Sequence, residues 1–173
     1  MPTCKFERED LLKANEDWGC NCGPASLSFA LQKTLDEIKP AMQHVGFIEK
    51  RHTNPTMMAN ALRYLGVSWS TVKVPVRNAE GGMDIEPLFN GDRISLVRIQ
   101  WTGPWTKPGA LQKWAYRQTH WVATWQERSV PLVFDCNAGI RGLDGWEMDI
   151  VPMLTSQYSR ADGGWFPTHI WKV

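Results

Sequence analysis

The sequence predicts an α+β fold in which an N-terminal helical part packs on an antiparallel β-sheet. Two observations carry this prediction. Helix caps and helically spaced apolar residues are confined to residues 7–65, whereas alternating, β-branched segments follow Gly66. The 173 residues also contain no internal repeat, low-complexity segment or linker, and 43% of them are hydrophobic. We therefore expect one domain that spans residues 1–173.

The first helical segments surround a pair of cysteines. Residues 7–14 are predicted to form a short lead-in helix. A second helix begins at Gly23, with Pro24 in the first turn, where proline is tolerated. Asn21 or Cys22 then lies at the cap of this helix.

Two further helices are expected before the chain changes character. The run from Thr34 to Glu37 is a capping box that opens one of them. The other is predicted from about Thr56 to Leu65, where Gly66 ends it.

The second half of the chain is predicted to supply the sheet. The strand candidates are residues 67–76, 93–101, 120–125, 132–138 and 164–173. Between them, residues 77–92 form a connector with room for a helical turn, and the Pro/Gly-rich residues 102–110 form a loop.

Composition and charge exclude several function classes. The net charge is +1, with both signs mixed along the chain, so nucleic acid is not an expected partner. The charged N-terminus is not a secretory signal, and no apolar run approaches the ~20 residues that span a membrane. We expect a cytoplasmic protein, in which the four cysteines are reduced thiols.

Cys22 has the context that a catalytic cysteine needs. A cysteine is nucleophilic only as the thiolate, and its pKa falls at a helix N-terminus beside an imidazolium. The helix expected directly after Cys22 meets the first condition, and its free backbone N–H groups would stabilise an oxyanion. A histidine, with a carboxylate or amide to orient it, would complete the site.

His120 is the most suitable of the four histidines. It begins the apolar strand candidate HWVATW, and a strand end would hold the imidazole rigidly at the edge of a site. His44 lies in a predicted helix and His52 in the loop after it, without an obvious orienting partner, while His169 lies in the last strand candidate.

The residues that could orient His120 lie on the next strand candidate. The segment FDCN puts Asp135 and Asn137 on one strand face and Cys136 on the other. If the two strands are neighbours, a carboxylate or amide reaches the far ring nitrogen of His120. The candidate site is therefore Cys22, His120 and Asp135, with Asn137 as the alternative third member.

Three segments in this order resemble a known superfamily. NCGPASLSFAL, THWVATW and VFDCNAG together are similar to the papain-like cysteine peptidases. The closer likeness is to the compact bacteriocin-processing (double-glycine) peptidases and their bacterial and phage relatives, whose nucleophile lies in a Cys-Gly-Pro-Ala or similar run. Phytochelatin synthases share a similar segment. The resemblance implies a papain-like fold and the catalytic order Cys22, His120, Asp135; for a phage protein, the host cell or virion would be the location.

The chain departs from the superfamily before the nucleophile. The superfamily usually places a glutamine six residues upstream, where its amide donates to the oxyanion, and this chain has Glu16 there. An ionised glutamate cannot donate a hydrogen bond. Asn15 and the indole N–H of Trp18 are the other oxyanion candidates.

The cysteines have two alternative interpretations, a nucleophile at Cys20 and a zinc site. The sequence DWGC is similar to the Trp-Gly-Cys of autophagy and ubiquitin-fold-modifier peptidases, which would make Cys20 the nucleophile, but the helix begins at Cys22. A Cys₃His zinc site from Cys20, Cys22, Cys136 and His120 lacks the usual pair of Cys-x(2–4)-Cys spacings. We expect no metal and no cofactor.

The sequence thus predicts a thiol hydrolase that cleaves a peptide or isopeptide bond of a peptide or protein substrate. Trp101, Trp105 and Trp121 are candidate contacts at the substrate rim, although packing alone would also account for them. A non-catalytic papain-like domain that binds a peptide or partner protein is the alternative, and Glu16 favours it. A transpeptidase would use the same residues with an amine in place of water.

Overall fold

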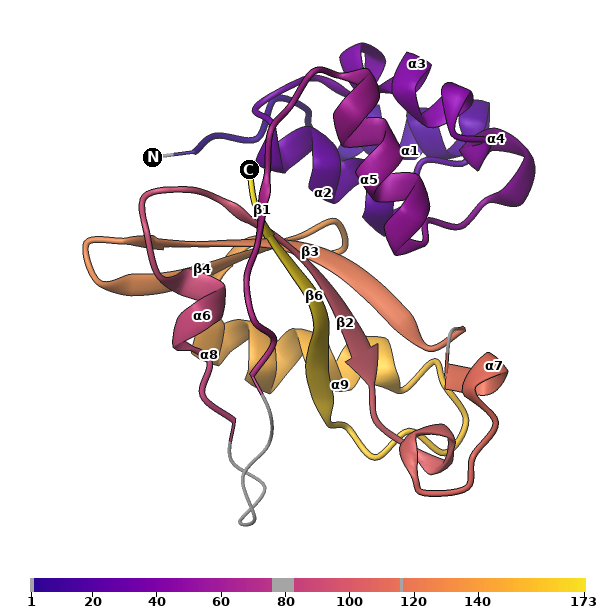
Figure 1. Ribbon diagram of the computed structural model, residues 1–173, viewed down its shortest axis with the longest axis vertical. Coiled ribbons are helices and arrows are strands. Elements are labelled where there is room, and N and C mark those ends of the chain that lie inside the picture. The colour runs from indigo at the N-terminus through magenta and orange to yellow at the C-terminus, as the bar shows by residue number, and fades with distance from the viewer. Residues whose placement is uncertain (1, 76–82, 116) are drawn as a thin grey trace.

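The protein forms an α+β structure with N-terminal helices packed against a six-stranded antiparallel sheet. The computed structural model describes residues 2–75, 83–115 and 117–173. Figure 1 shows the helical layer above the sheet and a second set of shorter helices below it. The fold class expected from the sequence is confirmed, and the lower helical layer is an addition that the sequence did not reveal.

The upper layer contains the first helices of the chain. They are α1 (Arg8–Trp18), α2 (Cys22–Ala30), α3 (Leu35–His44), α4 (Phe47–Lys50) and α5 (Pro55–Tyr64). The capping box of α3 is present, because the Thr34 side chain accepts from the Glu37 N–H and the Glu37 side chain accepts from the Thr34 N–H. Gly66, at a φ of +68°, follows α5 in the left-handed conformation that favours glycine.

The sheet has the strand order β1-β6-β2-β3-β4-β5, and every neighbouring pair is antiparallel. The strands are β1 (Ser70–Thr71), β2 (Ser95–Trp101), β3 (Thr119–Glu127), β4 (Val130–Asp135), β5 (Gly139–Gly142) and β6 (Trp165–Lys172). Of the candidate site, β3 carries His120 and β4 carries Asp135.

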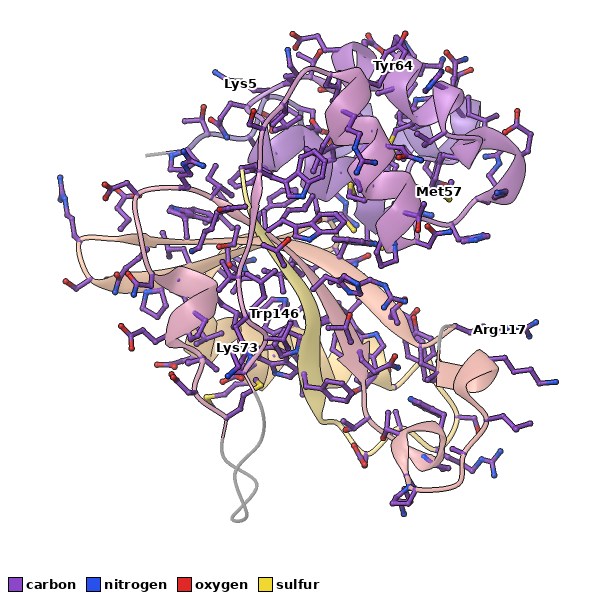
Figure 2. All side chains as sticks on the ribbon, in the orientation of Figure 1. Lys5, Met57, Tyr64, Lys73, Arg117 and Trp146 are labelled. Atoms are coloured by element: carbon purple, nitrogen blue, oxygen red, sulfur yellow. The ribbon has the colours of Figure 1, made fainter. Side chains whose placement is uncertain are left out.

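Both faces of the sheet are covered, which explains why β2 is buried along its whole length and β3 from His120 to Trp125. Trp121, Ala123 and Trp125 of β3 pack against the upper helices. Val122, between them, lies in a second core with residues of the lower helices. Trp146, a member of this second core, is labelled below the sheet in Figure 2. Successive strand residues point to opposite faces, so alternate apolar residues serve two different cores.

The lower layer is formed by short helical turns. They are α6 (Glu86–Phe89), α8 (Leu143–Gly145), the π-helix η2 (Trp146–Ile150) and α9 (Val151–Thr155). Two further turns, the 3₁₀ helix η1 (Pro104–Thr106) and α7 (Gln112–Ala115), lie in the β2–β3 connection. In the described residues, no helix is long and apolar enough to cross a membrane.

Three sequence-based boundaries need correction. The strand expected over residues 67–76 is reduced to Ser70–Thr71, and its last residue lies outside the described residues. The lead-in helix extends to Trp18 rather than residue 14. The strand expected over residues 132–138 ends at Asp135. The helical turn for which the connector 77–92 had room is α6, as expected, while residues 77–82 lie outside the described part.

Candidate active site

Cys22 is the first residue of the nine-residue helix α2. Asn21 caps this helix, because its Oδ1 accepts from the backbone N–H of Gly23 at 3.3 Å. The helix is fixed to the sheet by Ser26, whose buried hydroxyl donates to the carbonyl oxygen of Trp121 at 2.9 Å. This contact brings the N-terminal end of α2 to the residue that follows His120 in β3.

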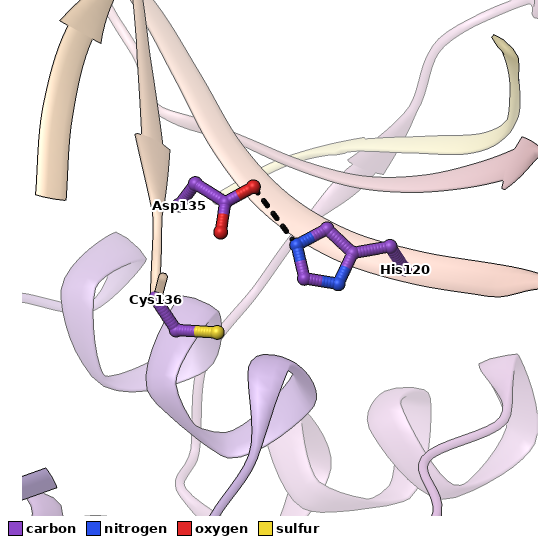
Figure 3. Close-up of side chains that lie close together, drawn as sticks. All are labelled: His120, Asp135 and Cys136. Atoms are coloured by element: carbon purple, nitrogen blue, oxygen red, sulfur yellow. Dashed lines mark hydrogen bonds and ion pairs between the residues drawn. The ribbon is translucent and has the colours of Figure 1, made fainter. Parts of the chain in front are cut away.

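His120 lies near the start of β3 and is 8% exposed. Its Nε2 is 2.9 Å from Oδ2 of Asp135 (Figure 3). The ring also stacks on Trp101, with ring centroids 5.8 Å apart and planes 22° from parallel. The imidazole is therefore held both in its plane and at its far nitrogen.

Asp135 is the last residue of β4 and is fully buried. Its Oδ2 also accepts from the indole Nε1 of Trp146 at 3.0 Å. Its Oδ1 accepts from the backbone N–H of Asn137 at 2.9 Å and from the Asn137 side-chain amide at 3.0 Å. Asp135 is therefore the candidate third member that contacts His120. Asn137, the alternative candidate, donates to the Asp135 carboxylate instead.

The charges of the site stabilise a thiolate–imidazolium pair. Burial alone would raise the pKa of the Cys22 thiol, but the charge of His120, a hydrogen bond to its ring and the Trp121 N–H outweigh burial and lower this pKa. Burial alone would lower the pKa of His120, but the charges of Asp135 and Cys22 and hydrogen bonds to both raise it to about 10. A thiolate beside an imidazolium is the nucleophilic form of such a pair.

The two neighbouring cysteines have the opposite character. Cys20 is 1% exposed, and burial, with the charge of Cys22, raises the pKa of its thiol to about 12. Burial and the charge of Cys22 likewise raise the pKa of the Cys136 thiol well above its ordinary value. All four cysteines are free thiols, and Cys22 is the one whose pKa is lowered.

Two hollows meet at Cys22. The first is a cavity of about 380 Å³ between α1 and the lower layer, lined among others by Asn15, Cys136 and Leu154. The second is a groove of about 1120 Å³ that runs from Cys22 along α5 and β3 toward α7. Asn21, Cys22 and Tyr158 line both, so a chain lying across them would pass over the sulfur.

The three oxyanion candidates occupy different places. Asn15 lines the cavity, and one proton of its side-chain amide is donated to the Cys20 carbonyl at 2.8 Å, which leaves the second N–H. Glu16 is exposed and is not among the residues that line either hollow. Trp18 is buried in the upper core against Phe47. Of the three, Asn15 alone borders the site.

The three rim tryptophans are all packed residues. Trp101 lines the cavity and stacks on His120, while Trp121 lines the groove and donates from Nε1 to the Thr53 carbonyl at 3.0 Å. Trp105 lines neither hollow and donates to the Trp101 carbonyl at 2.7 Å. Only the first two could contact a substrate.

The other histidines lie outside the dyad. His44 stacks on Tyr64, and the Nδ1 atom of His52 lies 3.0 Å from the Lys50 carbonyl. His169 in β6 lines the far part of the groove.

One group of described residues has metal-ligand geometry. The ligand atoms of His120, Asp135 and Cys136 lie within 4.8 Å of one another. The donor set fits a metal poorly, because both Asp135 oxygens already accept hydrogen bonds and the raised pKa of Cys136 keeps it a neutral thiol.

Two residues of the site, Trp146 and Tyr158, were not predicted from the sequence. Trp146 supports Asp135 from the π-helix η2, and Tyr158 borders both hollows. Neither follows a motif or a recognisable periodic pattern, so the sequence offered no signal for either.

In comparisons with family models, curated proteins and solved structures, no match to this chain was found.

Proposed function

We propose that this protein is a papain-like thiol hydrolase that cleaves a peptide or isopeptide bond through Cys22, His120 and Asp135. One observation carries the proposal: Cys22 begins a helix and is the cysteine whose thiol pKa is lowered, and the histidine that lowers it, His120, has its Nε2 2.9 Å from the buried Asp135 carboxylate. Each part has a defined role in thiol catalysis, namely nucleophile, base and orienting group.

The reaction would proceed in two steps. The Cys22 thiolate attacks the carbonyl carbon, and the oxyanion is bound by the Cys22 backbone N–H and the second amide proton of Asn15. The His120 imidazolium gives its proton to the leaving amine, and the C–N bond breaks to leave a thioester on Cys22. His120 then takes a proton from water as the water attacks the thioester. The C–S bond breaks, which releases the acid and restores the Cys22 thiolate and the His120 imidazolium. An amine in place of water would give transpeptidation.

The thiol chemistry can be tested without knowing the substrate. Alkylation by iodoacetamide at about pH 6 should be at least tenfold faster at Cys22 than at glutathione, because the thiolate is already present there. Hydrolysis of p-nitrophenyl acetate should be abolished by Cys22→Ala and kept by Cys20→Ala. Peptide mapping by mass spectrometry assigns the alkylated residue.

Two results would count against the proposal. Alkylation of Cys22 that follows an ordinary thiol pKa would favour the non-catalytic binding domain. Loss of esterase activity in Cys20→Ala but not in Cys22→Ala would move the nucleophile to Cys20.

A further inference from the structure

The groove beside Cys22 concentrates positive charge in a chain that is almost neutral overall. Among the described residues that line it, Arg51, Arg98, Lys113 and Arg117 are basic and none is acidic. The whole chain has 19 basic and 18 acidic residues, so this segregation is a local property of the groove. A groove lined by one sign of charge attracts ligands of the opposite sign.

The charges along the groove are available to a ligand. Arg51, Lys113 and Arg117 are exposed, and in the described part of the chain none of the three forms an ion pair. Figure 2 shows Arg117 close to α7, at the end of the groove away from the helical layer. His169 contributes little charge near neutral pH, because burial and Arg98 lower its pKa.

Two of the basic residues are held in position. Arg51 packs over Gly19, where a Cβ would overlap its guanidinium, and its carbonyl accepts from the Asn21 side chain at 3.1 Å. Arg98 is 4% exposed and donates to Thr168 at 3.2 Å and Thr119 at 3.3 Å. The positive charge therefore begins beside the cap of α2 and continues along the groove.

A peptide fits this groove better than a nucleic acid does. Single-stranded nucleic acids bind by stacking bases on exposed aromatic rings as well as by charge. Trp121 and Tyr158 are the Trp and Tyr residues among the described residues that line the groove. Trp121 is only 2% exposed, so a substrate could touch no more than its edge, and Tyr158 is half-buried; the groove therefore offers no row of open ring faces. The groove also opens directly at Cys22, where an extended peptide would present its carbonyl.

We infer that the groove binds an acidic segment of the substrate, with glutamate or aspartate side chains next to the bond that Cys22 attacks. The inference rests on the proposed function for the reaction and on the groove alone for the charge preference. Arg51, Lys113 and Arg117 are the specificity-determining residues.

Binding can be measured separately from chemistry. Fluorescence anisotropy with fluorescein-labelled Gly-Glu-Glu-Glu-Glu-Gly and Gly-Gln-Gln-Gln-Gln-Gly should give about fivefold tighter binding of the glutamate peptide at about 20 mM salt. The preference should vanish at about 500 mM salt, where exposed charges are screened. Saturating glutamate peptide should also slow the alkylation of Cys22 by iodoacetamide.

A matched pair of variants locates the effect. Lys113→Gln/Arg117→Gln should lose the preference, whereas Arg93→Gln/Arg128→Gln, which removes equal charge from exposed positions at the other end of β2 and β3, should keep it. Circular dichroism checks that each variant folds.

Each failure has its own meaning. The inference is overturned if the two peptides bind equally well, or if both double variants lose the glutamate preference to the same extent, even if Cys22 is reactive. Tighter binding of an oligothymidine of about six nucleotides, weakened by the same groove variant, would replace the peptide with a nucleic acid. If Cys22 reacts like an ordinary thiol but the glutamate peptide is still preferred, the proposed function is overturned, and the inference that the groove binds an acidic ligand stands.

Discussion

At the scale of single residues, the site depends on how Asp135 is held. Its carboxylate accepts from His120, from the Trp146 indole and from both N–H groups of Asn137. Burial alone would raise its pKa, but the charge of His120 and these hydrogen bonds lower it to about 2. The carboxylate thus remains charged well above pH 2, and it holds Nε2 of His120, which leaves Nδ1 as the ring nitrogen for Cys22.

Asp135→Asn should separate charge from shape. The variant keeps the volume but removes the negative charge that raises the pKa of His120, so less imidazolium and less thiolate form near neutral pH. Iodoacetamide alkylation of Cys22 should fall about tenfold at pH 6 and remain nearly unchanged at pH 9.5, where any thiol ionises. Asn137→Ala is the control, and it should change the pH dependence of Cys22 alkylation far less. An unchanged profile in Asp135→Asn would remove Asp135 from the mechanism.

At the scale of elements, the α2–β3 contact positions Cys22 beside His120. Gly23, directly after Cys22, lies so close to Thr53 that a Cβ would overlap the Thr53 hydroxyl and Cβ. This close approach lets the first turn of α2 lie beside the segment before α5, whose Thr53 carbonyl also holds the Trp121 indole. The Gly of the NCGPA segment is therefore explained by packing.

Gly23→Ala should disturb the dyad as well as the fold. The added methyl must displace either Thr53 or the start of α2, which costs about 1–3 kcal/mol in overpacking. The free energy of unfolding from urea titration should fall by that amount, and the pH 6 alkylation of Cys22 should slow. Gly145→Ala is the control, since a Cβ there meets open space and the residue is helical. Equal effects of the two substitutions would show that the contact with Thr53 does not matter.

The elements differ in how far the sequence could predict them. Helix α3 was predictable because its capping box is a local signal, and β3 and β4 because their apolar, β-branched runs are long. The lower layer was not predictable, since η2 and α9 are short, α9 contains Pro152, and their apolar residues join a core whose other members come from strands far away in the sequence. Strand β1 is brief because it pairs only with β6, at the edge of the sheet.

At the scale of the whole molecule, the site occupies the junction between the two cores. Cys22 and Trp121 belong to the upper core, whereas Trp101 and Trp146 belong to the lower one. His120 and Asp135 therefore connect the charge state of the site to the packing of both layers. The residue types of the dyad could be selected from the sequence, but the Trp146 contact and the basic groove depend on tertiary structure and could not.

This connection makes the stability of the protein depend on pH in a defined way. His120 has an ordinary pKa of 6.5 and a folded pKa of about 10, so its contribution is complete below pH 6.5 and is lost as pH rises through 10. Cys22 has an ordinary pKa of 9.0 and a lowered folded pKa, so its contribution is complete above pH 9 and is lost as pH falls through the folded value. At pH values above 6.5, above the folded pKa of Cys22 and below 9, the folded pair and the unfolded pair each bind one proton in total, so the pair makes no pH-dependent contribution to the free energy of unfolding there.

Cys22→Ser should therefore change the shape of the stability curve. Without the thiolate, folded His120 stays protonated beside Asp135 while the unfolded histidine loses its proton above pH 6.5, so the free energy of unfolding should decline with rising pH by up to about 1.4 kcal/mol per pH unit. In the unsubstituted protein this His120 decline should be absent wherever the pH exceeds the folded pKa of Cys22, because the thiolate compensates for it. Both should lose on the order of 2 kcal/mol as pH falls from about 4 to about 2, where Asp135 is protonated. Urea titrations across this range measure the difference in the free energy of unfolding between the two proteins, in which all other titrating groups cancel. Parallel curves of this free energy against pH between pH 6.5 and 9 would contradict the thiolate–imidazolium pair.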